Sequence, residues 1–184
     1  MARWEPVLDE VMRERSPRLL AYARLLTGDD AEAQDVLQDA LVRAFSRGRA
    51  FDNANLAESY VRRAIPSVFI DRLRKRKAAE RAHDKDAAIG GRDVFYSDRD
   101  VVMDVRAALA ALPPQERACV VLRFYDDLTV PQIAAQLKLA EGTVKRYLSD
   151  ASGKLTQLLG EDVDVPTGPT GVPVVVPAMK GAGR

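Results

Sequence analysis

One short amphipathic stretch, at residues 141–149, carries polar side chains suited to binding nucleic acid. Its sequence is EGTVKRYLS, and Val144 and Leu148 recur four positions apart, which places both on one side of a helix. The polar residues that face other directions are Thr143, Lys145, Arg146 and Ser149. Lysine and arginine donate hydrogen bonds to guanine edges in the DNA major groove, and hydroxyl groups donate to phosphates. The stretch is therefore a candidate for a helix that contacts DNA.

The residues before this stretch supply an element that would position it. A first helix is predicted from about Val130 to Leu137, with Ile133 and Ala134 on its apolar side, and a second begins near Glu141 after a three-residue turn. Two short helices in this arrangement are typical of a helix-turn-helix, whose second helix lies in the major groove. An ordinary helical hairpin in a protein core is the alternative.

The boundaries of the first helix have recognisable signals. Thr129 and Gln132 have the spacing of a capping box, and Pro131 lies in the first turn, where its missing N–H costs little. The turn is less favourable, because Lys138 stands where glycine most easily adopts a left-handed conformation.

Charge is sorted along the chain although the net charge is only +1. Residues 60–85 contain nine lysines and arginines against three carboxylates, whereas residues 29–58 contain seven carboxylates against three arginines. A basic segment of this density favours phosphate backbones, and the separation suggests two different partners.

Composition excludes several classes of protein. The 184 residues allow one domain or two small ones, and the hydrophobic content of 47% is ordinary for a globular protein. The single cysteine, Cys119, excludes a disulfide framework and is interpreted as a small buried hydrophobe in a reducing cytosol, with a reactive thiol as the alternative. No signal peptide or membrane-length apolar run is present, so a cytoplasmic protein without membrane insertion is expected.

The apolar pattern predicts an all-α chain. Helices are expected at about 6–26, where Pro17 can divide the element, from Asp29 or Asp30 to about Arg47, and from Asn55, with an Asn55–Glu58 capping box, through Leu73. Residues 83–100 lose the pattern and are interpreted as a flexible linker. The second half is predicted to be helical at 101–112, at 114–125 and from the helix-turn-helix to Leu159. Residues 160–184, rich in proline and glycine, are predicted to be a disordered tail, in which VPVVVP could alternatively dock as a strand.

With both halves considered, the chain resembles the extracytoplasmic-function (ECF) class of bacterial sigma factors. The resemblance rests on four stretches in order: LLAYARLLTGDDAEAQDVLQDALVRAF at 19–45, ESYVRRAIPSVFIDRLRKR at 58–76, VRAALAALPPQERACVVLRFYDDLTVPQIAAQL at 105–137 and EGTVKRYL at 141–148. It implies a sigma-2 domain at 5–82, a linker at 83–100, a sigma-4 domain at 101–159 and the tail at 160–184. It also implies core RNA polymerase and promoter DNA as partners, leaves an anti-sigma factor open as another, and implies no cofactor.

The resemblance assigns roles to individual residues. It places a polymerase-docking surface, on the clamp of the largest subunit, at Asp35, Gln38 and Asp39. The second domain is implied to bind the flap of the second-largest subunit. Capture and opening of the −10 element is assigned to Tyr60, Arg62, Arg63, Arg72, Arg74 and Lys75, with Phe69 either a base-receiving surface or core. Reading of the −35 element is assigned to Thr143, Lys145, Arg146 and Ser149, with Arg117 and Arg123 as candidate phosphate contacts.

The chain departs from the usual family pattern at three places. Arg-Asn is usual where this chain has Pro66-Ser67, Ser-Arg is usual where it has Arg146-Tyr147, and arginine is common where it has Asp150. The promoter sequence therefore does not follow from the family.

Three alternatives compete with this interpretation. A helix-turn-helix regulator would bind operator DNA without polymerase, but leaves 19–76 unexplained. A protein-binding adaptor fits poorly with the cations at 62–77. An enzyme is disfavoured, because the sequence offers no metal-ligand cluster or glycine-rich phosphate loop and its one histidine, His83, lies in the predicted linker.

Overall fold

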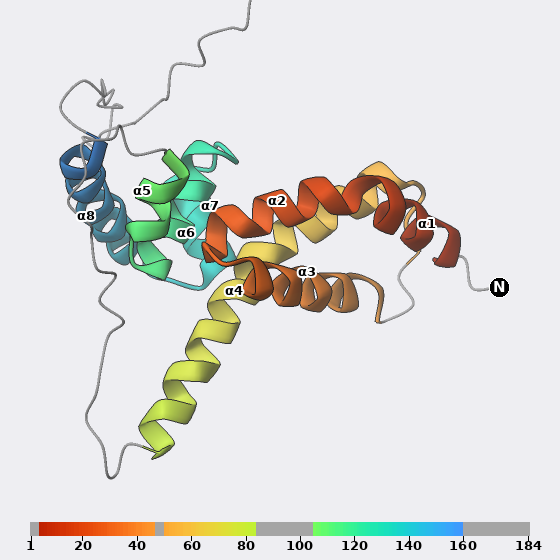
Figure 1. Ribbon diagram of the computed structural model, residues 1–184, viewed down its shortest axis with the longest axis horizontal. Coiled ribbons are helices and arrows are strands. Elements are labelled where there is room, and N and C mark those ends of the chain that lie inside the picture. The colour runs from red at the N-terminus through yellow and green to blue at the C-terminus, as the bar shows by residue number, and fades with distance from the viewer. Residues whose placement is uncertain (1–3, 47–49, 84–104, 160–184) are drawn as a thin grey trace, which may run out of the picture. The chain divides into compact units, whose positions relative to one another are not determined.

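The computed structural model describes residues 4–46, 50–83 and 105–159, and all regular structure in these ranges is helical (Figure 1), which confirms the all-α class. The chain divides into two compact units between Ser97 and Asp98. The first unit contains α1 to α4, and the second contains α5 to α8. The predicted tail and all of the predicted linker except His83 lie outside the described residues.

The first predicted helix is divided next to Pro17, as expected. It consists of α1 (Glu5–Glu10), a π-helical turn η1 (Val11–Arg15) and α2 (Ser16–Thr27). Within the junction the Ser16 N–H donates to the Val11 carbonyl, five residues back, and Pro17 has no N–H to continue an α-helical ladder. A π-helical turn is one way for the chain to pass this position without ending the helical segment.

The α2–α3 connection follows its sequence signals. Gly28 ends α2 with φ 71°, a left-handed conformation that costs glycine little. Asp29 then caps α3 (Asp30–Phe45), because its Oδ1 accepts a hydrogen bond from the Glu32 N–H at 2.8 Å.

The start of α4 differs from the prediction. The helix spans Ala54–His83, and its cap is Asn53, whose Oδ1 accepts from the Leu56 N–H at 3.0 Å. The predicted Asn55–Glu58 box is wrong, since Asn55 already lies inside the helix. Asn55 and Glu58 instead contact Arg15, at 3.1 and 3.6 Å. The helix is continuous through Pro66 and extends as far as His83, beyond Leu73, where its apolar pattern ends.

The core of the first unit lies between α2, α3 and α4, which pack against one another. Its largest fully buried side chains include Leu19, Leu26, Val36, Ile65, Phe69 and Ile70. Phe69 is 1% exposed, which decides between its two predicted roles: it belongs to the core.

The second unit contains α5 (Val105–Ala111), α6 (Pro114–Phe124), α7 (Val130–Leu137) and α8 (Glu141–Leu159). The predicted boundaries of α7 and α8 hold, and the capping box is present, with the Thr129 N–H donating to Gln132 Oε1 at 2.8 Å. The core is formed by small and branched side chains of all four helices, including Ala108, Leu122, Ile133, Leu137, Val144 and Leu148.

Lys138 adopts the left-handed conformation that the sequence suggested, with φ 54° and ψ 52°. An L-residue pays about 1–2 kcal/mol for this conformation and glycine does not. Because glycine also gains entropy in the unfolded chain, we expect Lys138→Gly to raise the free energy of unfolding by about 0.5–1 kcal/mol. Urea denaturation would measure the change. Lys138→Ala keeps the Cβ atom and should give no such gain, so an equal gain in both variants would contradict this explanation.

Cys119 is fully buried on α6, which confirms its interpretation as a core residue. Burial, with a smaller contribution from the Glu116 charge, raises the pKa of the thiol to about 12. The unfolded thiol ionises from about pH 8.5, whereas the folded thiol stays protonated, so this group should lower stability as pH rises from about 8.5 towards 12. Cys119→Ala should lack this contribution. We also expect no alkylation by iodoacetamide at pH 8 until denaturant is added; rapid alkylation of the folded protein would contradict the assignment.

Candidate nucleic-acid interface

The helix-turn-helix presents its predicted DNA-contacting residues on the surface. Val144 and Leu148 face the core of the second unit, at 0% and 2% exposure, and Ala151 and Leu155 continue the same buried side. The opposite side of α8 carries the exposed side chains of Lys145, Arg146, Ser149 and Asp150, and Thr143 is half-buried near its N-terminus. The geometry leaves one polar side of α8 available for a groove, and the contacts to bases stay a prediction.

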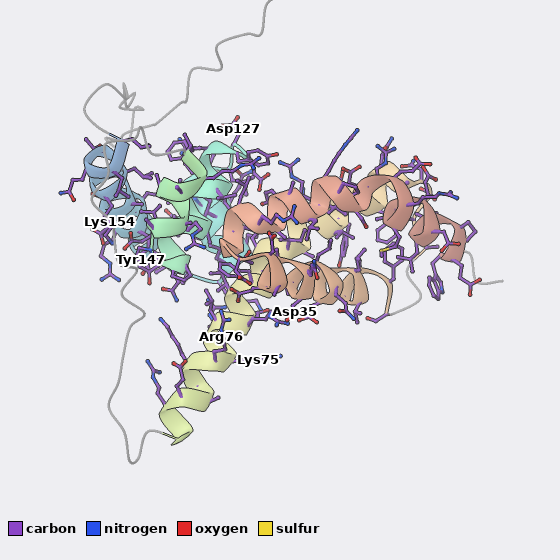
Figure 2. All side chains as sticks on the ribbon, in the orientation of Figure 1. Asp35, Lys75, Arg76, Asp127, Tyr147 and Lys154 are labelled. Atoms are coloured by element: carbon purple, nitrogen blue, oxygen red, sulfur yellow. The ribbon has the colours of Figure 1, made fainter. Side chains whose placement is uncertain are left out.

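Two polar contacts join α8 to α6. The Tyr147 hydroxyl donates to Gln115 Oε1 at 2.5 Å, and Lys154 Nζ donates to both Glu116 carboxylate oxygens at 2.7 and 2.8 Å. Figure 2 labels both Tyr147 and Lys154 on α8. The partners lie 32 and 38 positions apart, so no local sequence signal could have revealed them. These contacts fix α8 along its length against α6.

The two arginines of α6 hold backbone carbonyls. Arg117 is only 6% exposed and donates to the carbonyls of Leu109, Ala110 and Leu112 at 2.8–2.9 Å. Its predicted role as a phosphate contact is therefore wrong, because the guanidinium is buried and ties the end of α5 to α6. Arg123 donates to the Leu128 carbonyl at 2.9 Å, just before α7.

The predicted polymerase-docking residues lie together on α3, where Asp35, Gln38 and Asp39 are all exposed. Arg72 of α4 reaches both carboxylates, at 3.1 Å from Asp35 and 2.6 Å from Asp39. The hydrogen bond to Asp39 raises the pKa of Arg72, and the charges of Asp35 and Asp39 act in the same direction. One residue predicted to bind DNA and two predicted to bind polymerase thus form a single ion-pair cluster in the structure.

The neighbouring charges on α3 and α4 are also paired. Arg76 lies 2.6 Å from Glu32, and Asp71 lies between Arg43 at 3.5 Å and Arg74 at 3.4 Å. The acidic and basic segments distinguished in the sequence therefore partly neutralise one another where α3 and α4 pack side by side.

Two of the residues predicted to bind the −10 element contact aromatic rings within the first unit. The Tyr60 ring packs against Phe51 at a centroid distance of 5.5 Å, and the Arg62 guanidinium lies 5.0 Å from the centroid of the buried Tyr22 ring. Tyr60 stays half-buried, and Arg63 is exposed.

The last turns of α4 form the most exposed basic segment among the described residues. Within its own unit, α4 continues past α2 and α3 (Figure 1), and residues 75–81 are all exposed. The segment contains Lys75, labelled in Figure 2 with Arg76, and also Lys77 and Arg81. It is suited to a phosphate backbone, although no contact with DNA is present.

No group of histidine, cysteine and acidic side chains among the described residues could hold a metal ion. None of the helices in the described ranges is long and apolar enough to cross a membrane.

Comparison with known proteins places both units. The family model for sigma-70 region 2 matches residues 11–79, and the model for sigma-70 region 4 matches residues 103–155. Together they contain the acidic face of α3, α4 as far as residue 79, and most of the helix-turn-helix unit.

Similar whole chains are also known. The RNA polymerase sigma-E factor of Streptomyces avermitilis is 35% identical over 85% of this chain and 87% of its own length. The ECF RNA polymerase sigma factor SigM of Mycobacterium tuberculosis is 31% identical over 83% of this chain and 76% of its own length. The sigma factor RpoE, solved in complex with the anti-sigma factor NepR from Bartonella quintana, is similar in fold, with a TM-score of 0.53, 24% identity, and coverage of 86% of this chain and 95% of that one. The chain therefore belongs to the sigma-70 family of RNA polymerase sigma factors and, within it, to the ECF class.

Proposed function

We propose that this protein binds core RNA polymerase and directs it to promoters, with the second unit reading the −35 element and the first unit capturing and opening the −10 element. The observation that carries the proposal is the solvent-exposed polar side of α8, in a chain that also matches sigma-70 region 2. The buried Val144 and Leu148 on the other side of the helix hold it against the core. The protein supplies sequence recognition and strand capture, and polymerase supplies the chemistry. We propose no catalysis by the chain itself, and a cytoplasmic location beside polymerase.

The proposed DNA contacts divide by chemistry. Lys145, Arg146 and Ser149 would reach base edges, and Thr143 would donate to a phosphate near the start of α8. In the first unit Arg63 and Lys75 are exposed and suited to backbone phosphates, and Tyr60 offers part of a ring to an unstacked base. Arg62, Arg72 and Arg74 would contact DNA only by leaving or sharing their present partners.

The proposed polymerase contacts lie on α3. Asp35, Gln38 and Asp39 form an exposed polar face that fits a cationic surface, which we assign to the clamp of the largest subunit. The second unit is proposed to bind the flap of the second-largest subunit. Both units would then be held on one polymerase molecule while they contact the −35 and −10 elements. An anti-sigma factor is proposed as a further partner that would compete with these surfaces.

The test is transcription in vitro with core RNA polymerase from the source bacterium and a library of promoter fragments randomised at −35 and −10. We expect the chain to co-purify with core polymerase and to give runoff transcripts from a restricted set of sequences. Binding of operator-like DNA by the chain alone, without co-purification or transcripts, would instead support the helix-turn-helix regulator. Absence of binding to polymerase would overturn the proposal.

A further inference from the structure

Tyr147 of α8 has side-chain contacts both with α6 and with an exposed residue of α8 itself. Its hydroxyl donates to Gln115 Oε1 of α6 at 2.5 Å, and its ring is half-buried. The same ring lies beneath the exposed Arg146 guanidinium, whose central carbon is 5.4 Å from the ring centroid. That distance is within the range of a cation–π contact.

The Arg146 contact restricts a side chain that would otherwise sample many conformations. Consecutive residues on a helix point in directions about 100° apart and do not normally face each other. Arg146 therefore has to lie back over its neighbour, which selects a small set of rotamers. The guanidinium is planar, and its fork of N–H donors matches the O6 and N7 acceptors of guanine.

We propose that Tyr147 is a positioning residue for sequence recognition: anchored by Gln115, its ring holds Arg146 ready to read a base. The proposal rests on the proposed function, since it assumes that α8 reads the −35 element. Its physical basis is preorganisation. An arginine that is already ordered loses less conformational entropy on binding the correct base than one that must be ordered by the contact. Tyr147 itself would touch no base.

A purely structural role for Tyr147 makes a different prediction, and the chain contains a matched control. The Lys154–Glu116 pair also joins α8 to α6, at 2.7 and 2.8 Å, but Lys154 lies two turns further along the helix than Tyr147, the ring over which Arg146 lies. If Tyr147 only fastens α8, loss of either contact should affect all promoters alike. If Tyr147 positions Arg146, only its loss should change the preference among bases.

The experiment uses the holoenzyme and a panel of promoters that carries each of the four bases at every −35 position, with runoff transcription as the readout. We expect Arg146→Ala to reduce discrimination about tenfold at one position. Tyr147→Ala should reduce it at the same position by a similar factor. The double variant should discriminate no worse than Arg146→Ala alone, because both changes remove one interaction.

Conservative variants keep the test decisive if Tyr147→Ala fails to fold. Tyr147→Phe keeps the ring and removes its anchor, and Gln115→Leu removes the acceptor; each should lower discrimination at the Arg146 position a few-fold. Lys154→Ala should leave the preference profile unchanged.

Three results would overturn the inference. Unchanged discrimination in both conservative variants would exclude the anchored ring. An unchanged profile in Arg146→Ala would transfer base reading to Lys145 or Ser149 and leave the proposed function intact. A wild-type holoenzyme with no −35 preference would refute the proposed function itself, and the inference with it.

Discussion

Arg117→Ala is expected to lower the free energy of unfolding of the second unit by about 3–5 kcal/mol. The guanidinium is buried and donates to three carbonyls at the end of α5, at 2.8–2.9 Å from Leu109, Ala110 and Leu112. The last carbonyls of a helix have no partner within it, and a hydrogen bond from a charged donor contributes about 1.5–3 kcal/mol. Alanine would remove all three of these hydrogen bonds and leave the vacated volume unfilled, although the Leu109 carbonyl would still accept from the Leu112 N–H.

Two signals in one denaturation experiment can localise this effect. Trp4 is the only tryptophan of the chain and lies in the first unit, so its fluorescence follows that unit, whereas circular dichroism at 222 nm follows both. Only the circular dichroism transition of the second unit should shift. Arg117→Lys keeps the charge but cannot present the planar set of donors, and should fall between wild type and alanine. A loss below about 1 kcal/mol, or an equal shift in the Trp4 signal, would contradict the assigned role.

Asp39→Lys is expected to weaken binding of core polymerase about 100-fold, if the proposed docking on α3 is correct. A reversed charge would face the cationic surface that Asp39 is proposed to meet, and juxtaposed like charges cost several kcal/mol at an interface. The fold should survive, because half of the Asp39 side chain is exposed and exposed ion pairs contribute about 0–1 kcal/mol. Binding of labelled protein to core polymerase, followed by fluorescence anisotropy, measures the change, and circular dichroism checks the fold.

Arg72→Gln is the matched control, because Asp39 loses the same intramolecular partner but keeps its own charge. We expect this variant to bind polymerase as well as wild type or more tightly, since Arg72 competes with the partner for both carboxylates. A loss as large as that of Asp39→Lys would mean that the ion-pair cluster orders α3 and that the carboxylates do not themselves dock. A reversal at Asp39 without effect would exclude the docking surface.

Much of the local structure could be predicted from the sequence, because helix boundaries depend on neighbouring residues. The capping box at Thr129 and Gln132, the left-handed Lys138 and the division at Pro17 each follow from backbone hydrogen bonding within a few positions. The four-residue spacing of Val144 and Leu148 likewise determined which side of α8 stays exposed. The order of the motifs along the chain was sufficient to identify the family.

The partners of three arginines were decided by the tertiary structure. In the sequence, Arg72, Arg117 and Arg146 are equivalent cations with the same reach, but packing gives them different surroundings. Arg72 faces the carboxylates of α3, and Arg117 is buried against the end of α5. Arg146 stays on the surface over the ring of Tyr147.

The physical reason is that the fold decides which carbonyl, carboxylate or ring comes within about 3–6 Å of each arginine. The Asp39 and Asp35 carboxylates lie 33 and 37 positions from Arg72 in the chain. Arg117 and Arg146 contact groups nearby in the chain, but the packing of the helices determines which of the nearby groups each one meets.

The extension of α4 beyond Leu73 has a different explanation, which is local. Beyond Leu73 the helix covers no core, so the apolar period ends while alanine, arginine and lysine, all good helix formers, continue the helix to His83. Sequence thus determined the helices and their faces, and packing determined which side chains remain available for DNA and polymerase.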